Sequence, residues 1–583
     1  MYDVWNLDPL YKGFDDPSYL ADRKALEQVV GELDAFSQTM AGRAPADVLT
    51  EGIRLLERLS RLANKLLTYA TLRQAADTAQ PECGSQVGML MAIYGGCAGA
   101  DAAFRDYCAK LPNLMELVDS VEALQPYRFL FDNIAQGSRY LLPGKGEEIM
   151  ARMQLSGSNA WSDLQQYLTS TVPVSYRGGQ TTLSEIRNLA SDPDASVRKD
   201  AYDAELACYS SIRDSVAFAL HSIKLETLND CALRGYASPL ERTLKEAHMS
   251  RGTLDAMLEA MEEYLPVFRK YLRRKAEILG YQNGLPWYEL FAPMGKASEK
   301  FTPEQARGYL VNLFAGFDPE LSRLIADAFD HGWIDFFPRP GKSGGAFCAD
   351  VEALGESRIL TNFDGSFSAI ITLAHELGHA FHNLCILPHL PLNRDYSMPL
   401  AETASTFNEC VVMAAAIQSA GSDAQRLLLI ESQLQDATQI ICDIYSRYLF
   451  EAAVFDRRSE EFLNADALCA LMLDAQKRSY GDALDYSQPH PYMWICKSHY
   501  YGPTFYNFPY AFGGLFARGL YARYQQEGDA FVPKYKDLLY TTTIATAEDT
   551  AKVADIDLTD KNFWRSALQT IADQVELFCR LTA

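Results

Sequence analysis

Four of the chain's nine histidines lie within fifteen residues, and two of those four have the spacing of a metal site. In the segment SAIITLAHELGHAFHNL, the residues His375, Glu376 and His379 form the pattern HExxH. Residues four apart lie on one face of a helix, so both imidazole rings can reach a single ion. A glutamate between two such histidines can act as a general base in metal-assisted hydrolysis. The sequence therefore predicts one Zn²⁺ per chain, bound by His375 and His379, with Glu376 as the base.

A third zinc ligand must come from elsewhere in the chain, because a catalytic zinc ion usually has three protein ligands and one open position. The extended pattern HExxHxxGxxH is excluded, since it requires glycine and histidine where this chain has His382 and Cys385. A carboxylate from a following helix is the other common solution. The apolar segment PLAETASTFNECVVMAAAIQSA, which we expect to form that helix, carries Glu402 and Glu409.

Glu402 is the predicted third ligand. It lies 23 residues after His379, which leaves room for the first helix to end at nearby prolines and for a second helix to return beside it. Glu409 is seven residues further on, on the same helix face but about two turns away, so we expect it to orient a ligand histidine. His382 lies a further turn along the motif helix, and we expect it to pack or hydrogen-bond behind the ligands.

The elements that must position these residues are mostly helical. Residues 20–135 contain amphipathic segments such as EGIRLLERLSRLANKLLTYATLRQAAD, in which apolar residues recur three and four positions apart. Residues 172–182, VPVSYRGGQTT, predict a short hairpin, and helices resume after it. Residues 338–365 predict a small sheet directly before the motif helix, and helical periodicity then continues to the carboxyl terminus.

We therefore expect a mainly α protein with a small β-sheet next to the HExxH helix. The predicted regions are an amino-terminal helical region (1–115), a helical lobe with the hairpin (116–190) and a catalytic region (191–583). At 583 residues, the chain is long enough for more than one lobe. Its composition, with 48% hydrophobic and 22% charged residues, is that of a soluble globular protein.

Charge and cysteine usage exclude several classes of function. The net charge of −23 disfavours nucleic acids and anionic membranes as partners, because binding to phosphates is driven by Lys and Arg. The first residues, MYDVWNLDPLYKGFDDP, lack the basic and apolar regions of a secretory signal. The twelve cysteines are scattered and never form a CxxC pair, which is typical of reduced thiols. We expect a cytoplasmic protein without a cysteine metal site.

The glycine-rich segment GKSGGAFC, which begins at Gly341, could suggest a nucleotide-binding loop. That pattern requires a glycine five positions earlier, where this chain has Phe336. We expect Gly344, Gly345 and Ala346 instead to form the edge of the small sheet, where an extended peptide can pair through main-chain hydrogen bonds.

The segment NFDGSFSAIITLAHELGHAFHN, followed by LAETASTFNE, resembles the thimet oligopeptidase and oligoendopeptidase F family, and most closely its oligoendopeptidase F branch. The likeness extends to WNLDPLY, to GKSGGAFC and to a carboxyl-terminal cluster of His and Tyr, so it spans nearly the whole chain. The resemblance implies a two-lobed helical molecule with a deep channel and zinc at its floor. It also implies zinc ligation by His375, His379 and Glu402.

Members of that family also use a late histidine and tyrosines to hold the transition state. The matching segment here is HYYGPTFYNFPYAFGG, which supplies His499, Tyr506 and Tyr510. Such donors suit the oxyanion that develops when a peptide carbonyl is attacked. Relatives often have three alternating tyrosines, but this chain has Phe508 at the middle position. The roles therefore stay open among the tyrosines of the segment, Tyr500, Tyr501, Tyr506 and Tyr510.

These observations predict a zinc-dependent oligoendopeptidase that cleaves internal bonds of short unfolded peptides. One alternative is an exopeptidase of the dipeptidyl carboxypeptidase type, which needs a basic clamp for the substrate carboxylate that the sequence does not identify. Another is a helical peptide-binding protein without catalysis. The intact Glu376 argues against the latter, because a structural zinc site has no need of a base. The expected partners are oligopeptides, and the sequence predicts no oligomeric state.

Overall fold

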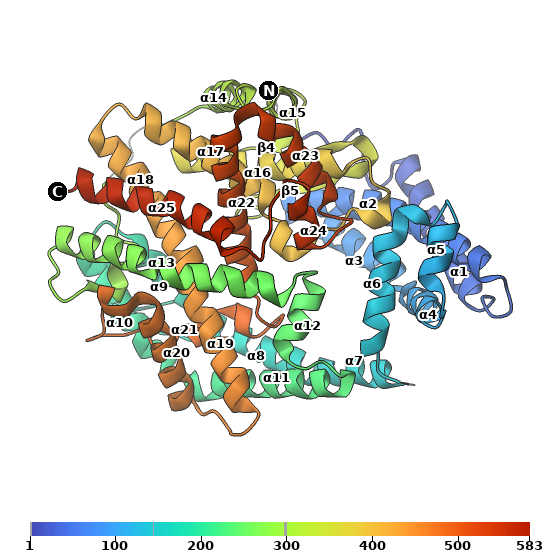
Figure 1. The fold of residues 1–583 in the computed structure, drawn as a ribbon, viewed down its shortest axis with the longest axis horizontal. Coiled ribbons are helices and arrows are strands. Elements are labelled where there is room, and N and C mark those ends of the chain that lie inside the picture. Colours follow the sequence, from blue (N-terminus) through green and yellow to red (C-terminus); the bar gives the residue numbers. More distant parts are fainter. Residues whose placement is uncertain (1–2, 144, 296–299) are drawn as a thin grey trace. The chain divides into compact units, whose positions relative to one another are not determined.

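The computed structural model describes residues 3–143, 145–295 and 300–583, and most of these residues are helical (Figure 1). Contacts within the chain divide it into two compact units, each built from three separate segments. Unit 1 comprises Met1–Arg139, Glu299–Ala415 and Arg523–Asp555, and unit 2 comprises Tyr140–Ser298, Ala416–Ala522 and Ile556–Ala583. The mainly α class is confirmed. The three regions expected above are consecutive in sequence, whereas these units are defined by contacts between separate segments. The three-region division therefore stays a prediction.

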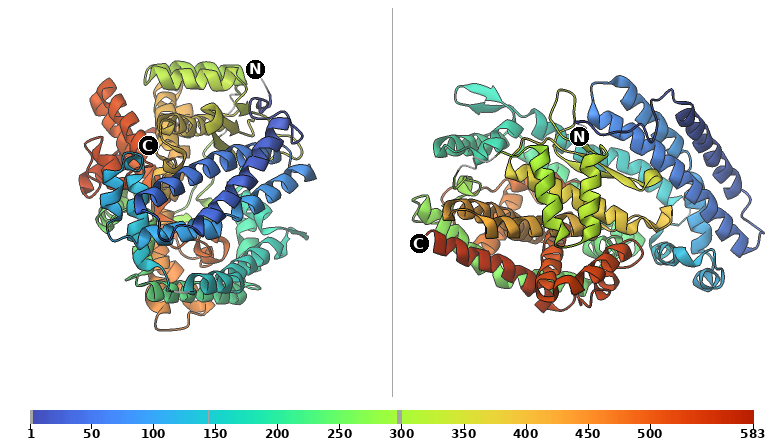
Figure 2. Two further views of the ribbon diagram at one scale, coloured as in Figure 1. Left: turned by 90° about the vertical axis from the view of Figure 1, so that its right-hand side faces the viewer. Right: turned by 90° about the horizontal axis from the view of Figure 1, so that it is seen from above.

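Unit 1 begins with the helices that the apolar periodicity predicts. They are α1 (Pro17–Ser37), α2 (Pro45–Ala76), α3 (Pro81–Gly95), α4 (Ala98–Ala109), α5 (Leu114–Ser120) and α6 (Arg128–Gly137). Proline is the first residue of α1, α2 and α3, a position where its missing N–H costs nothing. Helices α1 and α2 lie side by side (Figure 2), and fully buried residues such as Leu26 and Leu66 form part of their shared core.

One stretch of described residues, Pro81–Ala109, is apolar and long enough to cross a membrane by length and composition. In the fold it consists of two helices, α3 and α4, that meet at a break after Gly95. Leu90, Phe104 and Cys108 from this stretch are buried in the core of unit 1. A single stretch of this kind is therefore weak evidence for a membrane span.

A small sheet of unit 1 precedes the motif helix, as predicted. Its order is β4 (Ile334–Asp335), β6 (Glu356–Leu360) and β5 (Phe347–Val351), with β4 parallel and β5 antiparallel to the central β6. Strands β5 and β6 both pack against α16 (Phe367–Ile386), which contains the HExxH pattern. The remaining helices of this unit are α14 (Pro303–Ala315), α15 (Pro319–Asp330), α17 (Thr403–Ser419), α23 (Phe531–Thr541) and α24 (Ala547–Lys552).

Unit 2 begins with α7 (Gly146–Ser156) and α8 (Ser158–Thr171), followed by the predicted hairpin of β1 (Val174–Tyr176) and β2 (Gly179–Thr181). The two turn residues have positive φ angles, 47° at Arg177 and 82° at Gly178, as the commonest two-residue hairpin turn requires. Four helices follow, namely α9 (Leu183–Asn188), α10 (Ala195–Tyr209), α11 (Arg213–Arg234) and α12 (Pro239–Glu246).

The longer helices of unit 2 include α13 (Arg251–Ile278) and α25 (Lys561–Leu581), which lie side by side (Figure 1). The others are α18 (Asp423–Thr438), α19 (Ile444–Arg458), α20 (Ala465–Tyr480), α21 (Met493–Cys496) and α22 (Phe508–Glu527), the last of which continues into unit 1. Strands β3 (Leu285–Pro286) and β7 (Leu484–Asp485) form a short parallel pair. The segment Gln439–Asp443, between α18 and α19, is a π-helix.

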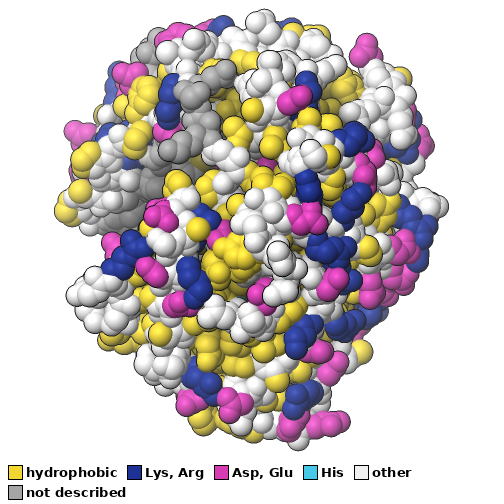
Figure 3. Space-filling model, turned by 90° about the vertical axis from the view of Figure 1, so that its left-hand side faces the viewer, with side chains coloured by type: hydrophobic (Ala, Val, Ile, Leu, Met, Phe, Trp, Pro, Cys, Tyr) yellow, Lys and Arg dark blue, Asp and Glu magenta, His cyan; other side chains and the backbone are white. Residues whose placement is uncertain are grey.

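All twelve cysteines are free thiols, and Cys83, Cys108, Cys231 and Cys442 are among the buried ones. Figure 3 shows one face of the molecule, on which basic and acidic side chains are interspersed. Such a mixture of both signs is typical of a solvated surface.

Candidate metal centre

Helix α16 presents His375 and His379 on one face, with their ring centroids 4.9 Å apart. The helix begins directly after Ser366, whose hydroxyl accepts a hydrogen bond from the Ala369 N–H at 3.2 Å. Its opposite face is apolar and buried, with Leu373 and Leu377 fully covered. The helix is therefore fixed from behind, while the two imidazoles remain partly accessible.

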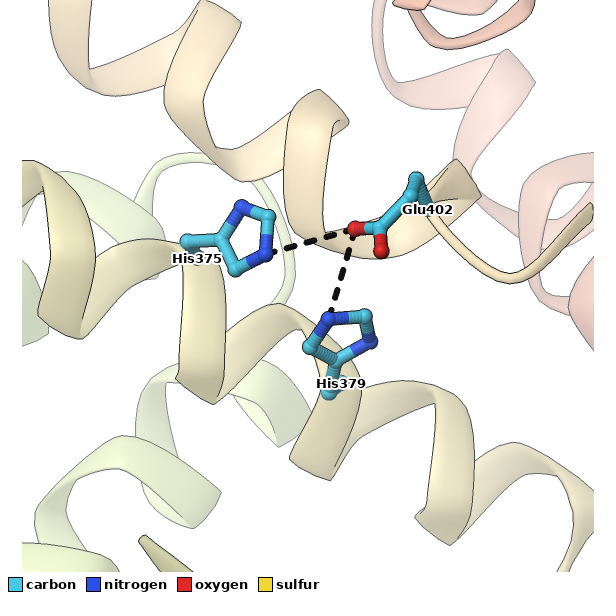
Figure 4. Close-up of side chains that lie close together, drawn as sticks. All are labelled: His375, His379 and Glu402. Atoms are coloured by element: carbon cyan, nitrogen blue, oxygen red, sulfur yellow. Dashed lines mark ion pairs between the residues drawn. The ribbon is translucent and has the colours of Figure 1, made fainter. Parts of the chain in front are cut away.

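Glu402 completes the group, since its Oε2 lies 3.3 Å from His375 Nε2 and 3.4 Å from His379 Nε2 (Figure 4). We expected Glu402 on the second helix, but it lies in the turn immediately before α17. Its carbonyl accepts the hydrogen bond of the Thr406 N–H at 3.1 Å, so Glu402 is the residue from which the helix starts. This position lets the side chain point along the turn toward α16.

Gly378 allows the two helices to approach closely enough for this contact. A Cβ atom at Gly378 would lie 2.5 Å from the Ala404 carbonyl oxygen and 2.6 Å from the Ser405 Cα. Both are backbone atoms, which cannot move aside as a flexible side chain can. Glycine at this position therefore leaves room for a close neighbour, and the neighbour is the start of α17.

The three donor atoms have the spacing that a zinc ion needs. Zinc binds histidine nitrogen and carboxylate oxygen at about 2.0–2.1 Å, so two ligand atoms of a tetrahedral site lie about 3.3–3.4 Å apart. The two nitrogen-to-oxygen distances of 3.3 and 3.4 Å agree with this value. All three donor atoms also lie within 4.8 Å of one another. The residues present therefore fit a zinc ion.

Glu409 lies behind His375, with its Oε1 2.5 Å from the ring Nδ1. A carboxylate can only accept, so Nδ1 carries the proton and the Nε2 lone pair is directed at the metal position. Burial by itself would lower the pKa of His375, but the charges and hydrogen bonds of Glu402 and Glu409 outweigh it and raise that pKa to about 10. With only protein charges acting, the group thus attracts a positive charge.

Ser405 is a further contact of the third ligand that sequence reasoning missed. Its hydroxyl donates a hydrogen bond to Glu402 Oε2 at 2.7 Å. The spacing of three residues at a helix start is the one signal that could have identified it. Burial raises the pKa of Glu402, but the hydrogen bonds from His375 and His379, with a smaller one from Ser405, outweigh this effect and lower it overall.

Glu376 is buried, with 5% of its surface exposed, on the same helix as the two histidines. Burial raises its pKa, and the neighbouring His375 and His379 oppose this shift. A carboxylate whose charged form is poorly solvated accepts a proton more readily than an ordinary surface carboxylate. This environment suits a general base.

His382 packs behind the metal group. It is fully buried, stacks on Tyr396 with ring centroids 4.5 Å apart, and places Nε2 2.8 Å from Thr542 Oγ1. The Thr542 hydroxyl donates to the Leu539 carbonyl, so the His382 ring is the donor to Thr542. Burial lowers the pKa of His382 to about 3. This ring connects α16 with the segment that follows α23.

The glycine-rich loop leads into β5, which is an edge strand of the small sheet. Asn362 Nδ2 donates to the carbonyls of Gly345 at 2.8 Å and Ser343 at 3.1 Å, which fixes the loop. Lys342 is fully buried and donates to three backbone carbonyls, so it has no freedom to contact a phosphate. The binding role expected for Gly344, Gly345 and Ala346 stays a prediction.

The late His and Tyr residues form a cluster of their own in unit 2. His499 belongs to the short 3₁₀ helix Ser498–Tyr500, and its Nε2 lies 3.5 Å from the hydroxyl of Tyr510 at the start of α22. Tyr506 stacks on His499 with ring centroids 5.5 Å apart and lies edge-on to Tyr510 at 5.4 Å. The structure thus brings the three predicted residues together.

Phe508 does not interrupt this cluster. It is fully buried, whereas Tyr510 is 39% exposed and Tyr506 is partly exposed. Tyr500 and Tyr501 are also buried in the core, and the Tyr501 hydroxyl donates to the Trp494 carbonyl at 2.8 Å. Tyr506 and Tyr510 are therefore the tyrosines of this segment that can meet a ligand.

Comparison with known proteins agrees with the pattern of the site. The model described as peptidase family M3 matches residues 311–570, and the model described as oligopeptidase F matches residues 112–172, so together they cover more than half of the chain. Oligopeptidase PepF of Bacillus subtilis is 23% identical in an alignment that covers 98% of this chain and 86% of that protein. An oligoendopeptidase F homolog of Lactococcus lactis is 22% identical over 98% of this chain and 96% of its own.

Solved structures share the fold. A protein of Chlamydophila abortus aligns with a TM-score of 0.85 at 19% identity, covering 98% of both chains. Oligoendopeptidase-F from Enterococcus faecium aligns with a TM-score of 0.72 at 17% identity, covering 97% of this chain and 98% of its own. At these identities, the alignments establish the fold alone. The chemistry has to be argued from the residues of the site.

Proposed function

The chain belongs to peptidase family M3, in its oligoendopeptidase F branch, and from this premise we propose that it is a zinc-dependent oligoendopeptidase for short unfolded peptides. The observation that carries the zinc assignment is the convergence of His375, His379 and Glu402 at the spacing of a tetrahedral site. Curated relatives that match nearly the full length of the chain are named oligopeptidases or oligoendopeptidases, in keeping with peptide substrates.

In the proposed mechanism, His375, His379 and Glu402 hold one zinc ion, and Glu409 orients His375. The ion supplies Lewis-acid polarisation of the scissile carbonyl and lowers the pKa of the attacking water. Glu376 takes the proton from that water and transfers it to the leaving amine. The buried position of Glu376 supports this assignment, because it favours the protonated state through which the proton passes.

We further propose that His499, Tyr506 and Tyr510 donate hydrogen bonds to the oxyanion of the transition state. Burial, reinforced by the nearby charges of Arg447 and Lys497, lowers the pKa of His499, so its ring is neutral near pH 7. A neutral imidazole can still donate through one nitrogen. Extended substrate is proposed to pair with the edge formed by Gly344, Gly345 and Ala346.

Replacing Glu376 by Gln tests the mechanism directly. The change keeps the size of the side chain but removes the base, so we expect bound zinc to remain at one ion per chain while kcat falls by about a hundredfold or more. Zinc is measured by elemental analysis and activity with a quenched fluorescent peptide. Activity close to that of the wild type would remove Glu376 from the mechanism.

A peptide blocked at both ends distinguishes the endopeptidase from an exopeptidase. Cleavage of the blocked peptide is expected, because an endopeptidase needs neither terminus.

We also propose a cytoplasmic location, which the twelve free cysteines support, since free thiols persist in reducing compartments.

A further inference from the structure

Unit 2 contains a cavity of about 400 Å³ that the proposed mechanism does not use. Its walls come from α9, α10, the segment 287–291, the π-helix between α18 and α19, and the segment that precedes His499. Several aromatic residues line it, namely Tyr202, Trp287, Tyr288, Phe291 and Tyr480. A cavity of this size, with apolar walls and a few polar groups, is typical of a site for a small molecule.

Most charged side chains of this cavity are already paired. Arg198 and Glu289 form a buried pair 2.5 Å apart, with 4% and 1% of their side chains exposed. Glu205 Oε1 lies 2.5 Å from Arg187 Nη1 and 2.8 Å from the Tyr209 hydroxyl. Glu289 and Glu205 are therefore each occupied by a cation of the protein.

Lys497 differs from these groups because its ammonium has no close partner among the described residues. The nearest carboxylate oxygen is Asp443 Oδ2, at 3.9 Å, and that same oxygen forms a short hydrogen bond with Arg447. Burial lowers the pKa of Lys497, which Asp443 opposes and the charges of Arg447 and Arg187 reinforce. Arg187 lines the same cavity as Lys497.

Arg187 is a second cation of the cavity with unused capacity. It uses Nη1 for its contacts with Glu205, Tyr209 and Cys496, which leaves Nε and Nη2 without a hydrogen bond to the described residues. His490 differs, because its Nε2 lies 3.3 Å from the Glu205 carboxylate, which can only accept. In the neutral ring the unpartnered Nδ1 is therefore an acceptor, and it offers a carboxylate no hydrogen bond.

We propose that this cavity binds a small carboxylic acid with an aromatic or apolar body. Its carboxylate accepts hydrogen bonds from Lys497 and Arg187, and its body lies against the aromatic walls. The guanidinium of Arg187 and the ammonium of Lys497 can together donate to both carboxylate oxygens. The carboxylate can belong to the terminus of a short peptide or to a free small acid.

The test compares N-acetylphenylalanine with its amide, which differs only in lacking the negative charge. Binding is measured by calorimetry on the full-length, zinc-loaded protein carrying Glu376→Gln, so that it does not depend on peptide hydrolysis. We expect the acid to bind at least about tenfold more tightly than the amide. Equal binding of the acid and the amide overturns the proposal. This comparison needs no substitution in the cavity.

Variants then locate the site. Lys497→Met is expected to weaken binding of the acid by about tenfold or more, whereas Lys497→Arg retains it. Lys477→Met is the matched control, because Lys477 is exposed and does not line the cavity. If the acid binds the zinc ion instead, Lys497→Met leaves its affinity unchanged. That result contradicts the proposal.

A kinetic experiment on protein that keeps Glu376 decides whether the bound carboxylate belongs to the peptide substrate or to a free acid. If the carboxylate is that of the substrate, Lys497→Met raises KM for a quenched peptide with a free carboxyl terminus relative to KM for its amide. If it is that of a free acid, the ratio of the two KM values is the same in the variant and in the wild type, and N-acetylphenylalanine alters the rate only in the wild type. A protein inactive on every peptide that still binds the acid contradicts the proposed function and supports the cavity assignment.

Discussion

Glu409 Oε1 and His375 Nδ1 lie 2.5 Å apart, the tightest polar contact around the candidate metal ligands. The pairing fixes both the tautomer and the rotation of the ring, so that Nε2 is presented to the metal without further adjustment. Glu402 alone could not fix the tautomer and the rotation of this ring, because it contacts the other nitrogen of the ring. The two carboxylates therefore act on opposite sides of one imidazole.

Replacing Glu409 by Gln is expected to weaken zinc binding by about 10- to 100-fold, because a neutral amide holds the ring less firmly and makes it less basic. The affinity is measured by competition with a chromophoric chelator. Glu304→Gln, at an exposed position of the same unit, is the control. Unchanged affinity in Glu409→Gln would show that the contact has no influence on the metal.

Gly378→Ala is expected to destabilise the protein by about 1–3 kcal/mol, because the new methyl group meets the backbone of Ala404 at 2.5 Å. The helices must move apart, which also displaces Glu402 and lowers zinc affinity. Unfolding in urea and zinc titration measure the two effects. The control is Gly88→Ala on α3, where a methyl group meets nothing within 4 Å. There the same change should stabilise by about 0.5–1 kcal/mol.

Tyr510→Phe removes a hydroxyl that lies 3.5 Å from His499 Nε2. We expect kcat to fall by about tenfold to a hundredfold with little change in KM, because the lost contact is made in the transition state.

Phe508→Tyr is the converse change. It places a hydroxyl at a fully buried position, so we expect about 1–3 kcal/mol of destabilisation and no gain in activity. A faster Phe508→Tyr enzyme would show that the ring reaches the substrate.

His382 predicts an acid-sensitive stability. Its folded pKa is about 3 and its unfolded value about 6.5, so the unfolded chain binds the additional proton between these values. Stability is fully present above pH 6.5 and is lost as the pH falls, with a slope that approaches about 1.4 kcal/mol per pH unit. His382→Asn should flatten this slope between pH 6 and pH 4, measured by urea unfolding with chelator present.

Local patterns predicted the parts of the site that are local in sequence. The HExxH spacing, the apolar face of α16 and the polar turn before it identify one helix with two ligands. The position of Glu402 was less accurate, because helix periodicity does not indicate the first residue of a helix and the turn continues the same apolar pattern. The glycine at position 378 does not indicate from the sequence that the start of α17 packs against it.

The cavity of unit 2 could not be predicted, because its charged residues share no spacing. Arg187, Glu205, Asp443 and Lys497 come from four separate elements and meet only through tertiary packing. Single arginines and lysines at such positions are indistinguishable from solvated surface residues in a sequence. The burial of Phe508 is similar, since an aromatic run does not reveal which rings face the core.

The interleaving of the two units has a consequence for synthesis on the ribosome. The metal group of unit 1 lies within residues 375–409, but that unit also requires Arg523–Asp555, whose helix α23 packs against α16 and whose Thr542 bonds His382. The zinc-bearing half is therefore incomplete until nearly the whole polypeptide has emerged.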